Sequence, residues 1–159
     1  MVFAVDFDGT VVSDARPYAD TETPLVFIPG AREALLALRR AGHTLLLWSA
    51  RSSPALIDDP ALNPLVRVGA VPESRARWEA MRHVHLARLA QMLAFVEREL
   101  PEVFDAIDDG RGGKPVGVDF FLDDKALRLG RGTGGFGWGE IAEMYGEPDH
   151  GKPVGRLSA

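Results

Sequence analysis

Two carboxylates lie two residues apart near the start of the chain, in the run DFDGT at residues 6–10. The run follows the apolar stretch 2–5, which is typical of a buried parallel strand. Side chains two residues apart point the same way along an extended chain, so we expect the carboxylates of Asp6 and Asp8 to face one cavity. Gly9 then lets the chain turn tightly and brings backbone N–H groups near a ligand.

A cation would relieve the repulsion between these two carboxylates. Mg²⁺ suits such a site because it takes one or two carboxylates and keeps waters for a substrate phosphate. A calcium-binding EF-hand loop beginning at Asp6 would need glycine and an acidic residue where the chain has Val11 and Pro17. An acidic turn would explain the pair alone, but not the polar residues that end other apolar runs. We therefore favour a catalytic metal site.

Two other mostly apolar runs also end in polar side chains. The run 44–48 ends at Ser49, and the run 118–122 ends at Asp123 and Asp124. Taken alone, such residues are usually turn or helix caps. Open parallel sheets bind ligands at the carboxyl ends of their strands, so we expect all three residues to lie near the first carboxylate pair.

The DFDGT run directly after an apolar strand resembles the first signature of the haloacid dehalogenase (HAD) superfamily, and the chain is similar to its small, capless, phosphatase-type members. By this resemblance Asp6 is a nucleophile that becomes an aspartyl-phosphate. Asp8 is the general acid/base that protonates the leaving group and then activates water. An aspartate at this second position is typical of phosphatases and phosphomutases in the family. Ser49 matches the second signature, a hydroxyl that hydrogen-bonds the transferring phosphoryl group.

The resemblance also implies a metal site and a lysine that neutralises the phosphate. The acid pair matches the fourth signature, in which the first aspartate ligates Mg²⁺ and the second ligates it or holds its waters. Lys114 is the favoured lysine because of its separation from the acid pair and the proline after it, whereas Lys125 is expected to point outward. The implied metal ligands are Asp6, Asp8, Asp123 and Asp124. The implied phosphate-binding residues are Ser49, Lys114, Gly9 and Thr10.

The chain alternates between strand-like and helix-like segments, which is typical of an α/β fold with a parallel sheet. We expect helices over 31–40 and 140–145, and one long helix or two abutting ones over 73–100. Further strands are expected over 44–48, 103–107 and 118–122. The resemblance implies a Rossmann-like three-layer sandwich with a mostly parallel central sheet, and the spacing of the motifs leaves no room for a large cap domain. We expect one domain over 1–159, with a short flap over 11–28 and a frayed tail over 146–159. The segment 52–72 holds four prolines and several acids, so we expect an irregular excursion there with one short turn.

The composition limits the partners of the protein. The 159 residues suffice for one domain with a core. The 18 basic and 23 acidic residues give a net charge of −5, which disfavours a nucleic-acid partner. The lack of cysteine excludes disulfides, thiolate metal sites and thiol nucleophiles. No apolar run reaches the roughly 20 residues that span a bilayer, and no signal peptide is recognised, so we expect a cytoplasmic protein with no membrane partner.

The expected partner is a phosphorylated small molecule or a bulky phosphorylated substrate. An open site also leaves room for a homo-oligomer in which a neighbouring subunit shields the substrate. Two alternatives to a phosphatase stay open. A phosphotransferase or phosphomutase would have to keep water from the intermediate. A non-catalytic signalling domain would bind Mg²⁺ or phosphate, but a receiver of that kind would carry its phosphoacceptor on a middle strand, where this chain has Ser49.

Four further features have plainer interpretations. Arg51 is interpreted as a surface arginine. His83 and His85 lie two apart on an expected helix, point in different directions and are interpreted as surface residues. The glycine-rich run 130–135 satisfies a G-x-G-x-x-G pattern, but it lacks the flanking strand and helix that a dinucleotide site needs.

Overall fold

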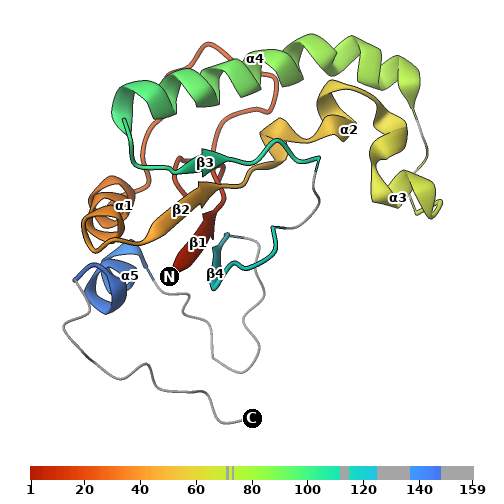
Figure 1. Cartoon of the computed structure of the whole chain (residues 1–159). Helices are drawn as coiled ribbons and strands as arrows, with labels where there is room; N and C mark the ends of the chain where they lie inside the picture. The colour runs from red at the N-terminus through yellow and green to blue at the C-terminus, as the bar shows by residue number, and fades with distance from the viewer. Residues whose placement is uncertain (71, 73, 112–114, 125–136, 148–159) are drawn as a thin grey trace.

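The centre of the protein is a parallel sheet. The computed structural model describes residues 1–70, 72, 74–111, 115–124 and 137–147. Among these residues, four strands pair in the order β3-β2-β1-β4, all parallel (Figure 1). The strands are β1 (Val2–Val5), β2 (Thr44–Leu47), β3 (Ala106–Ile107) and β4 (Phe120–Leu122). The α/β class and the parallel sheet predicted from the sequence are therefore confirmed.

Three helices join the sheet in one apolar core: α1 (Ala31–Arg40), α4 (Arg75–Glu99) and α5 (Trp138–Tyr145). Helix α1 buries a stripe that includes Leu35 and Leu38, whose spacing places them on one helix face. That stripe joins Phe3 of β1 and Phe95 of α4 in a single buried cluster. Figure 1 shows α1 beside α5, and α4 passing above β3. This packing fixes the central strands whose carboxyl ends carry the predicted site.

The helices expected from the sequence are present, with small shifts at their ends. Helix α4 is a single helix rather than two, and it begins after Ser74, whose Oγ accepts a hydrogen bond from the N–H of Arg77 (3.4 Å). Helix α5 begins before its predicted start. The N–H of Gly137 donates to Oε2 of Glu140 (2.8 Å), and this bond stabilises the earlier start. No helix in the described part of the chain is long and apolar enough to cross a membrane.

The excursion 52–72 differs most from its expected structure. Instead of one short turn it contains several, which are α2 (Pro54–Ile57), η2 (Pro60–Leu62) and α3 (Pro64–Arg67), and η1 (Ala50–Ser52) precedes them. Each of the first three begins at a proline, which suits the first helical position because no N–H is needed there. The prolines that seemed to exclude helix are therefore the residues that start it.

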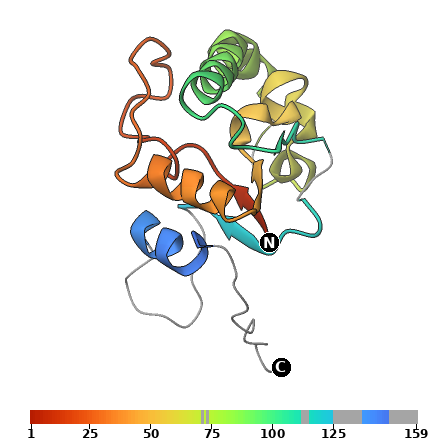
Figure 2. The ribbon, with the colours of Figure 1, turned by 60° about the vertical axis from the view of Figure 1, so that its left-hand side comes forward.

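Residues 11–28, which we call the flap, pair like a hairpin at their two ends. The N–H of Ser13 donates to the carbonyl of Val26 (2.9 Å), and the N–H of Ile28 donates to the carbonyl of Val11 (3.0 Å). Figure 2 shows the flap rising toward α4 from the end of β1. The flap thus connects the predicted nucleophile strand with the longest helix.

Candidate functional site

The register of the strands brings three of the predicted metal ligands together. Through Val5, β1 is in register with both β2 and β4, so the residues that follow these strands start from one edge of the sheet. Asp6, Asp123 and Asp124 each offer a carboxylate oxygen, and these oxygens all lie within 4.8 Å of one another. We call this group the acidic cluster. Clustered carboxylate oxygens are the ligands that a hard divalent cation prefers, so these residues could hold such a cation, and its identity as Mg²⁺ stays a prediction.

The fourth predicted ligand, Asp8, has a different environment. Arg51 donates to its Oδ2 from Nε (2.7 Å) and to its Oδ1 from Nη2 (2.6 Å). Arg88 donates to Oδ1 from Nη2 (3.2 Å). Paired bonds from one arginine are the strong form of contact between a guanidinium and a carboxylate. Asp8 is not part of the acidic cluster, and its role as a metal ligand stays a prediction.

The two arginines around Asp8, which we call the arginine clamp, are buried. The interpretation of Arg51 as a surface residue was wrong, because it is only 4% exposed, and Arg88 is 7% exposed. Arg51 also donates from Nη1 to the carbonyl of Arg88 (2.7 Å), and its guanidinium lies over the ring of Phe7. Burying a guanidinium is costly unless acceptors meet it, and Asp8 supplies them. The Nε of Arg88 has no hydrogen-bond partner among the described residues.

The clamp sets the charge of Asp8. Burial raises the pKa of Asp8, but hydrogen bonds and charges from Arg51 and Arg88 outweigh that effect and lower this pKa from its usual 3.8. Asp8 is therefore a carboxylate at neutral pH and can accept a proton as a general base. To act as a general acid, it must first take up a proton, which the clamp opposes.

Arg88 also connects the site to the flap. Its Nη1 donates to the carbonyl of Tyr18 (3.0 Å), and its guanidinium lies over the Tyr18 ring. The Tyr18 hydroxyl is hydrogen-bonded to Nδ1 of His85 (2.9 Å), and Gln91 donates to the carbonyl of Thr21 (3.2 Å). His85 is thus buried, against our expectation of a surface residue, and burial lowers its pKa. The flap, α4 and Asp8 are joined through one arginine side chain.

Ser49 is buried next to the acidic cluster. Its Oγ accepts a hydrogen bond from the N–H of Arg51 (3.3 Å), which is the cap that a serine commonly gives to a following helical turn. Ser49 also lines the same cavity as Asp6 and Asp123. The structure therefore places Ser49 at the cavity that Asp6 lines, and its binding of a phosphoryl group stays a prediction.

Gly9 and Thr10 hold the loop after β1 against the acid pair. Oγ1 of Thr10 accepts from the N–H of Asp124 (3.0 Å), and its carbonyl accepts from Nε1 of Trp138 (2.8 Å). Gly9 has φ +77°, and a Cβ there would lie 2.6 Å from Oδ2 of Asp124. The N–H of Gly9 donates to Val12 (2.8 Å). These contacts position Asp124, while phosphate binding by Gly9 and Thr10 stays a prediction.

Two hollows flank these residues. The larger one, about 780 Å³, is lined by Asp6, Ser49 and Asp123 together with the segment 53–67 and the loop after β3. A smaller one, about 330 Å³, is lined by the loop after β1, by the acid pair and by the start of α5. The predicted nucleophile lines the larger cavity, which we call the main cavity.

Four predicted features lie wholly or mostly outside the described residues. They are the favoured lysine Lys114, the competing Lys125, the glycine-rich run 130–135 and the tail 146–159, of which only 146 and 147 are described. The preference for Lys114 over Lys125 as the phosphate-binding lysine therefore stays a prediction from the sequence.

No protein-family model matches this chain, and comparisons with curated proteins and with solved structures found no significant match. The resemblance to the HAD superfamily therefore rests on the sequence motifs alone.

Sequence reasoning missed the arginine clamp. Arg51 lies two residues after Ser49, and Arg88 lies three residues after His85 on α4, but these spacings do not mark a buried arginine. Arginine is mostly exposed in proteins, and burial here depends on Asp8, which is distant in sequence. The burial of these two arginines therefore follows from tertiary contacts and not from a local sequence pattern.

Proposed function

We propose that this protein is a Mg²⁺-dependent phosphatase of the HAD type, which hydrolyses phosphate monoesters through an aspartyl-phosphate on Asp6. The observation that carries the proposal is that Asp6 belongs both to the acidic cluster and to the lining of the main cavity. A nucleophile of this kind needs both a cation site and room for a phosphate ester. A Rossmann-like three-layer sandwich without a large cap domain is part of the same proposal.

The metal belongs to the acidic cluster in this proposal. Mg²⁺ held there would screen the repulsion between the Asp6 carboxylate and the phosphate and polarise the phosphoryl oxygens. Asp6, Asp123 and Asp124 are the ligands that the structure supports.

The reaction then has two steps, in which Asp6 carries the phosphoryl group and Asp8 acts first as an acid and then as a base. A carboxylate oxygen of Asp6 attacks phosphorus, the bond to the ester oxygen breaks, and Asp8 gives a proton to the leaving alcohol. Water then attacks the same phosphorus and passes a proton to Asp8, the bond to Asp6 breaks, and inorganic phosphate leaves. Ser49 donates to a phosphoryl oxygen throughout, and Lys114 is the cation expected beside it.

The arginine clamp sets a condition on this cycle. In the described arrangement Asp8 is a carboxylate whose two oxygens both accept bonds, so it has no proton to give in the first step and is a weak base for water in the second. To donate a proton, Asp8 must give up a clamp bond, and its bond to Arg88 is the longest of the three. Because Arg88 also bonds to the carbonyl of Tyr18, we expect the flap to shift when Asp8 is released.

The clamp is also the observation that favours a second candidate. If the clamp stays closed, water is poorly activated and the aspartyl-phosphate lasts long enough to be passed to another acceptor or to act as a signal. The lifetime of the phosphorylated protein separates the two candidates. Rapid release of phosphate supports the phosphatase, whereas a stable phosphoryl group that an added alcohol removes supports a phosphotransferase.

The test is phosphate release from p-nitrophenyl phosphate and a panel of phosphorylated metabolites, with Mg²⁺ or with EDTA. The variants are Asp6→Asn, Asp8→Asn and, as a matched control, Asp14→Asn, an exposed flap residue. We expect Mg²⁺-dependent turnover in the wild type and the control, and a loss of about a thousandfold or more in Asp6→Asn. Unchanged turnover in Asp6→Asn would overturn the proposal.

A further inference from the structure

The main cavity has a wall that the predicted motifs do not account for. It reaches from Asp6 and Ser49 to the segment 53–67, whose short helices project beyond the carboxyl ends of the strands in Figure 1. The loop after β3 completes the lining. A phosphoryl group bound at Asp6 would therefore carry its leaving group into this part of the cavity.

The wall is held in place by bonds to α4. Nε1 of Trp78 donates to the carbonyl of Leu56 (2.9 Å), and Nε of Arg82 donates to the carbonyl of Ile57 (3.0 Å). Both carbonyls belong to α2. The wall is thus fixed to the longest helix of the protein, which favours a preformed binding surface.

The loop after β3 packs against the start of the same segment. Gly110 has φ +71°, and a Cβ there would lie 2.9 Å from Cδ of Pro54, so the two chains approach as closely as glycine allows. Arg111 pairs with Asp58 (Nη2 to Oδ2, 2.7 Å). These contacts join the two sides of the cavity.

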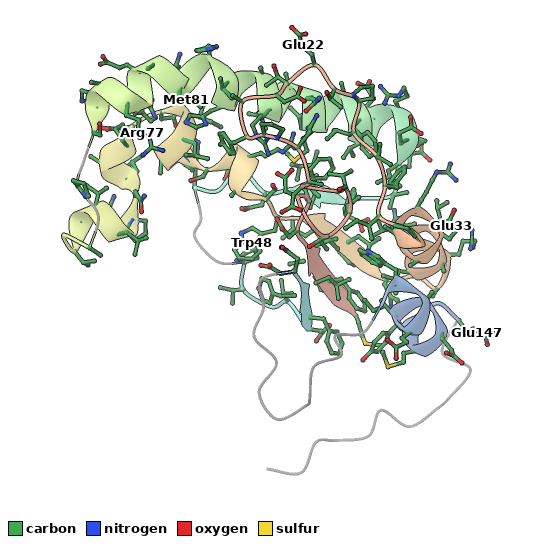
Figure 3. All side chains as sticks on the ribbon, turned by 180° about the vertical axis from the view of Figure 1, so that it is seen from behind. Glu22, Glu33, Trp48, Arg77, Met81 and Glu147 are labelled. Carbon is green, nitrogen blue, oxygen red and sulfur yellow. The ribbon has the colours of Figure 1, made fainter. Side chains whose placement is uncertain are left out.

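Apolar side chains line the cavity beside the nucleophile. Trp48 follows β2, and its ring meets that of Phe121 edge to face, with 5.2 Å between centroids. Figure 3 shows Trp48 beside the sheet, near the carboxyl end of β4. Leu62 is 40% exposed, and it lines the cavity together with Pro64. These surfaces favour the body of a ring-containing or otherwise apolar leaving group.

One cation of the lining has no acidic partner among the described residues. Arg67 is exposed, and its Nε donates only to the carbonyl of Ala61 (3.3 Å). Arg111, by contrast, is paired with Asp58, and its Nε also lies 3.9 Å from Asp109. The guanidinium of Arg67 keeps donors for a second anionic group, and a carboxylate or phosphate can take two of them at once.

We propose that the main cavity binds a phosphate monoester whose leaving group has an apolar ring and a second anionic group. The phosphate lies at Asp6, the ring packs on Trp48 and Leu62, and the second anion bonds to Arg67. This inference rests on the proposed function, because it assigns the phosphate to Asp6.

The size of the cavity favours a small molecule over a macromolecule. Its volume of about 780 Å³ lies within the roughly 300–1,000 Å³ of pockets that enclose small ligands. A carboxylate and a second phosphate share the chemistry that Arg67 would recognise, and the substrates below distinguish them.

The test uses pairs of aryl phosphates with similar shape. For 3-carboxyphenyl phosphate against its neutral carboxamide, we expect kcat/KM to favour the anion, and Arg67→Met to lower that preference about fivefold. A third substrate with a phosphonate in place of the carboxylate shows which anion Arg67 prefers. Arg98→Met, an exposed arginine on α4, is the matched control and should keep the full preference. A preference that Arg67→Met leaves unchanged would overturn the assignment.

A binding experiment separates this inference from the proposed function. Calorimetry with 3-carboxybenzylphosphonate and its carboxamide measures affinity without any turnover. We expect Arg67→Met to weaken only the carboxylate analogue, and Leu62→Asp to weaken both while leaving inorganic phosphate unaffected. Binding with this pattern but no hydrolysis of any ester would support the cavity and reject the phosphatase. Hydrolysis of simple esters with no effect of either variant would support the phosphatase and reject this cavity assignment.

Discussion

Replacing Arg51 by methionine removes the guanidinium that makes two of the three clamp bonds to Asp8. Water cannot readily take its place, because Arg51 is almost fully buried. Removing one partner of a buried ion pair typically costs about 3–5 kcal/mol. Asp8 keeps its bond to Arg88, so we expect the lower end of this range, about 3 kcal/mol of unfolding free energy at pH 7.

Arg88→Met should lower the unfolding free energy by less than Arg51→Met does. It removes the longer bond to Asp8 and the bond to the carbonyl of Tyr18, but it also removes an Nε that has no partner among the described residues. Charged hydrogen bonds are worth about 1.5–3 kcal/mol each, while a buried unpaired donor costs about 1–3 kcal/mol, so two lost bonds less one relieved donor give a net loss of about 2 kcal/mol. Arg98→Met, exposed on the same helix, should stay within about 0.5 kcal/mol of the wild type.

The pH dependence of the unfolding free energy shows whether Arg51 stabilises the fold through its ion pair with Asp8 or only through packing. The pKa of Asp8 in the folded protein is lowered below 3.8, so the carboxylate stabilises the fold above about pH 4, and this contribution is lost as the pH falls through the lowered pKa. The gap in stability between wild type and Arg51→Met should therefore narrow on acidification below pH 4. The assay is chemical denaturation at a series of pH values. A gap that stays constant over this range, or one no larger than that of Arg98→Met, would refute the reasoning.

Two further predictions concern activity and metal binding. Arg88→Met should raise the pKa of Asp8, so the limb of the pH–rate profile that reports Asp8 should move to higher pH; an unmoved limb would argue that Asp8 is not the group that titrates. Gly9→Ala and Gly42→Ala both place alanine at a φ near +80° and should each lose about 1–2 kcal/mol. A Cβ at Gly9 would also displace the Asp124 carboxylate, so Gly9→Ala should weaken Mg²⁺ in a titration; equal affinities in the two variants would contradict this.

The strand ends could be predicted because a few local rules fix them. Short apolar runs form the central strands, and parallel register then brings the residues after them to one edge. That is why the shared location of Asp6, Ser49 and Asp123 at one cavity could be predicted from the sequence. Helix α1 could be predicted equally well, because its apolar residues follow the helical period.

The clamp and the cavity wall could not be predicted in the same way. Whether an arginine is buried depends on an acceptor distant in sequence, and Arg88 meets Asp8 across 80 positions. The wall was expected to be irregular because its prolines were interpreted as helix breakers, whereas Pro54, Pro60 and Pro64 each begin a helical turn. The burial of the arginines thus depends on tertiary contacts, whereas the helical turns of the wall follow from a local preference of proline for the first helical position.

The most direct test of the central claim is to locate the phosphoryl group during turnover. The protein is quenched in acid while it hydrolyses p-nitrophenyl phosphate with Mg²⁺, reduced with borohydride, which converts an aspartyl-phosphate to homoserine, and mapped by mass spectrometry. We expect homoserine at position 6 in the wild type, and none with EDTA or without substrate. Turnover accompanied by a modified residue other than Asp6, or by no covalent intermediate at all, would contradict the account.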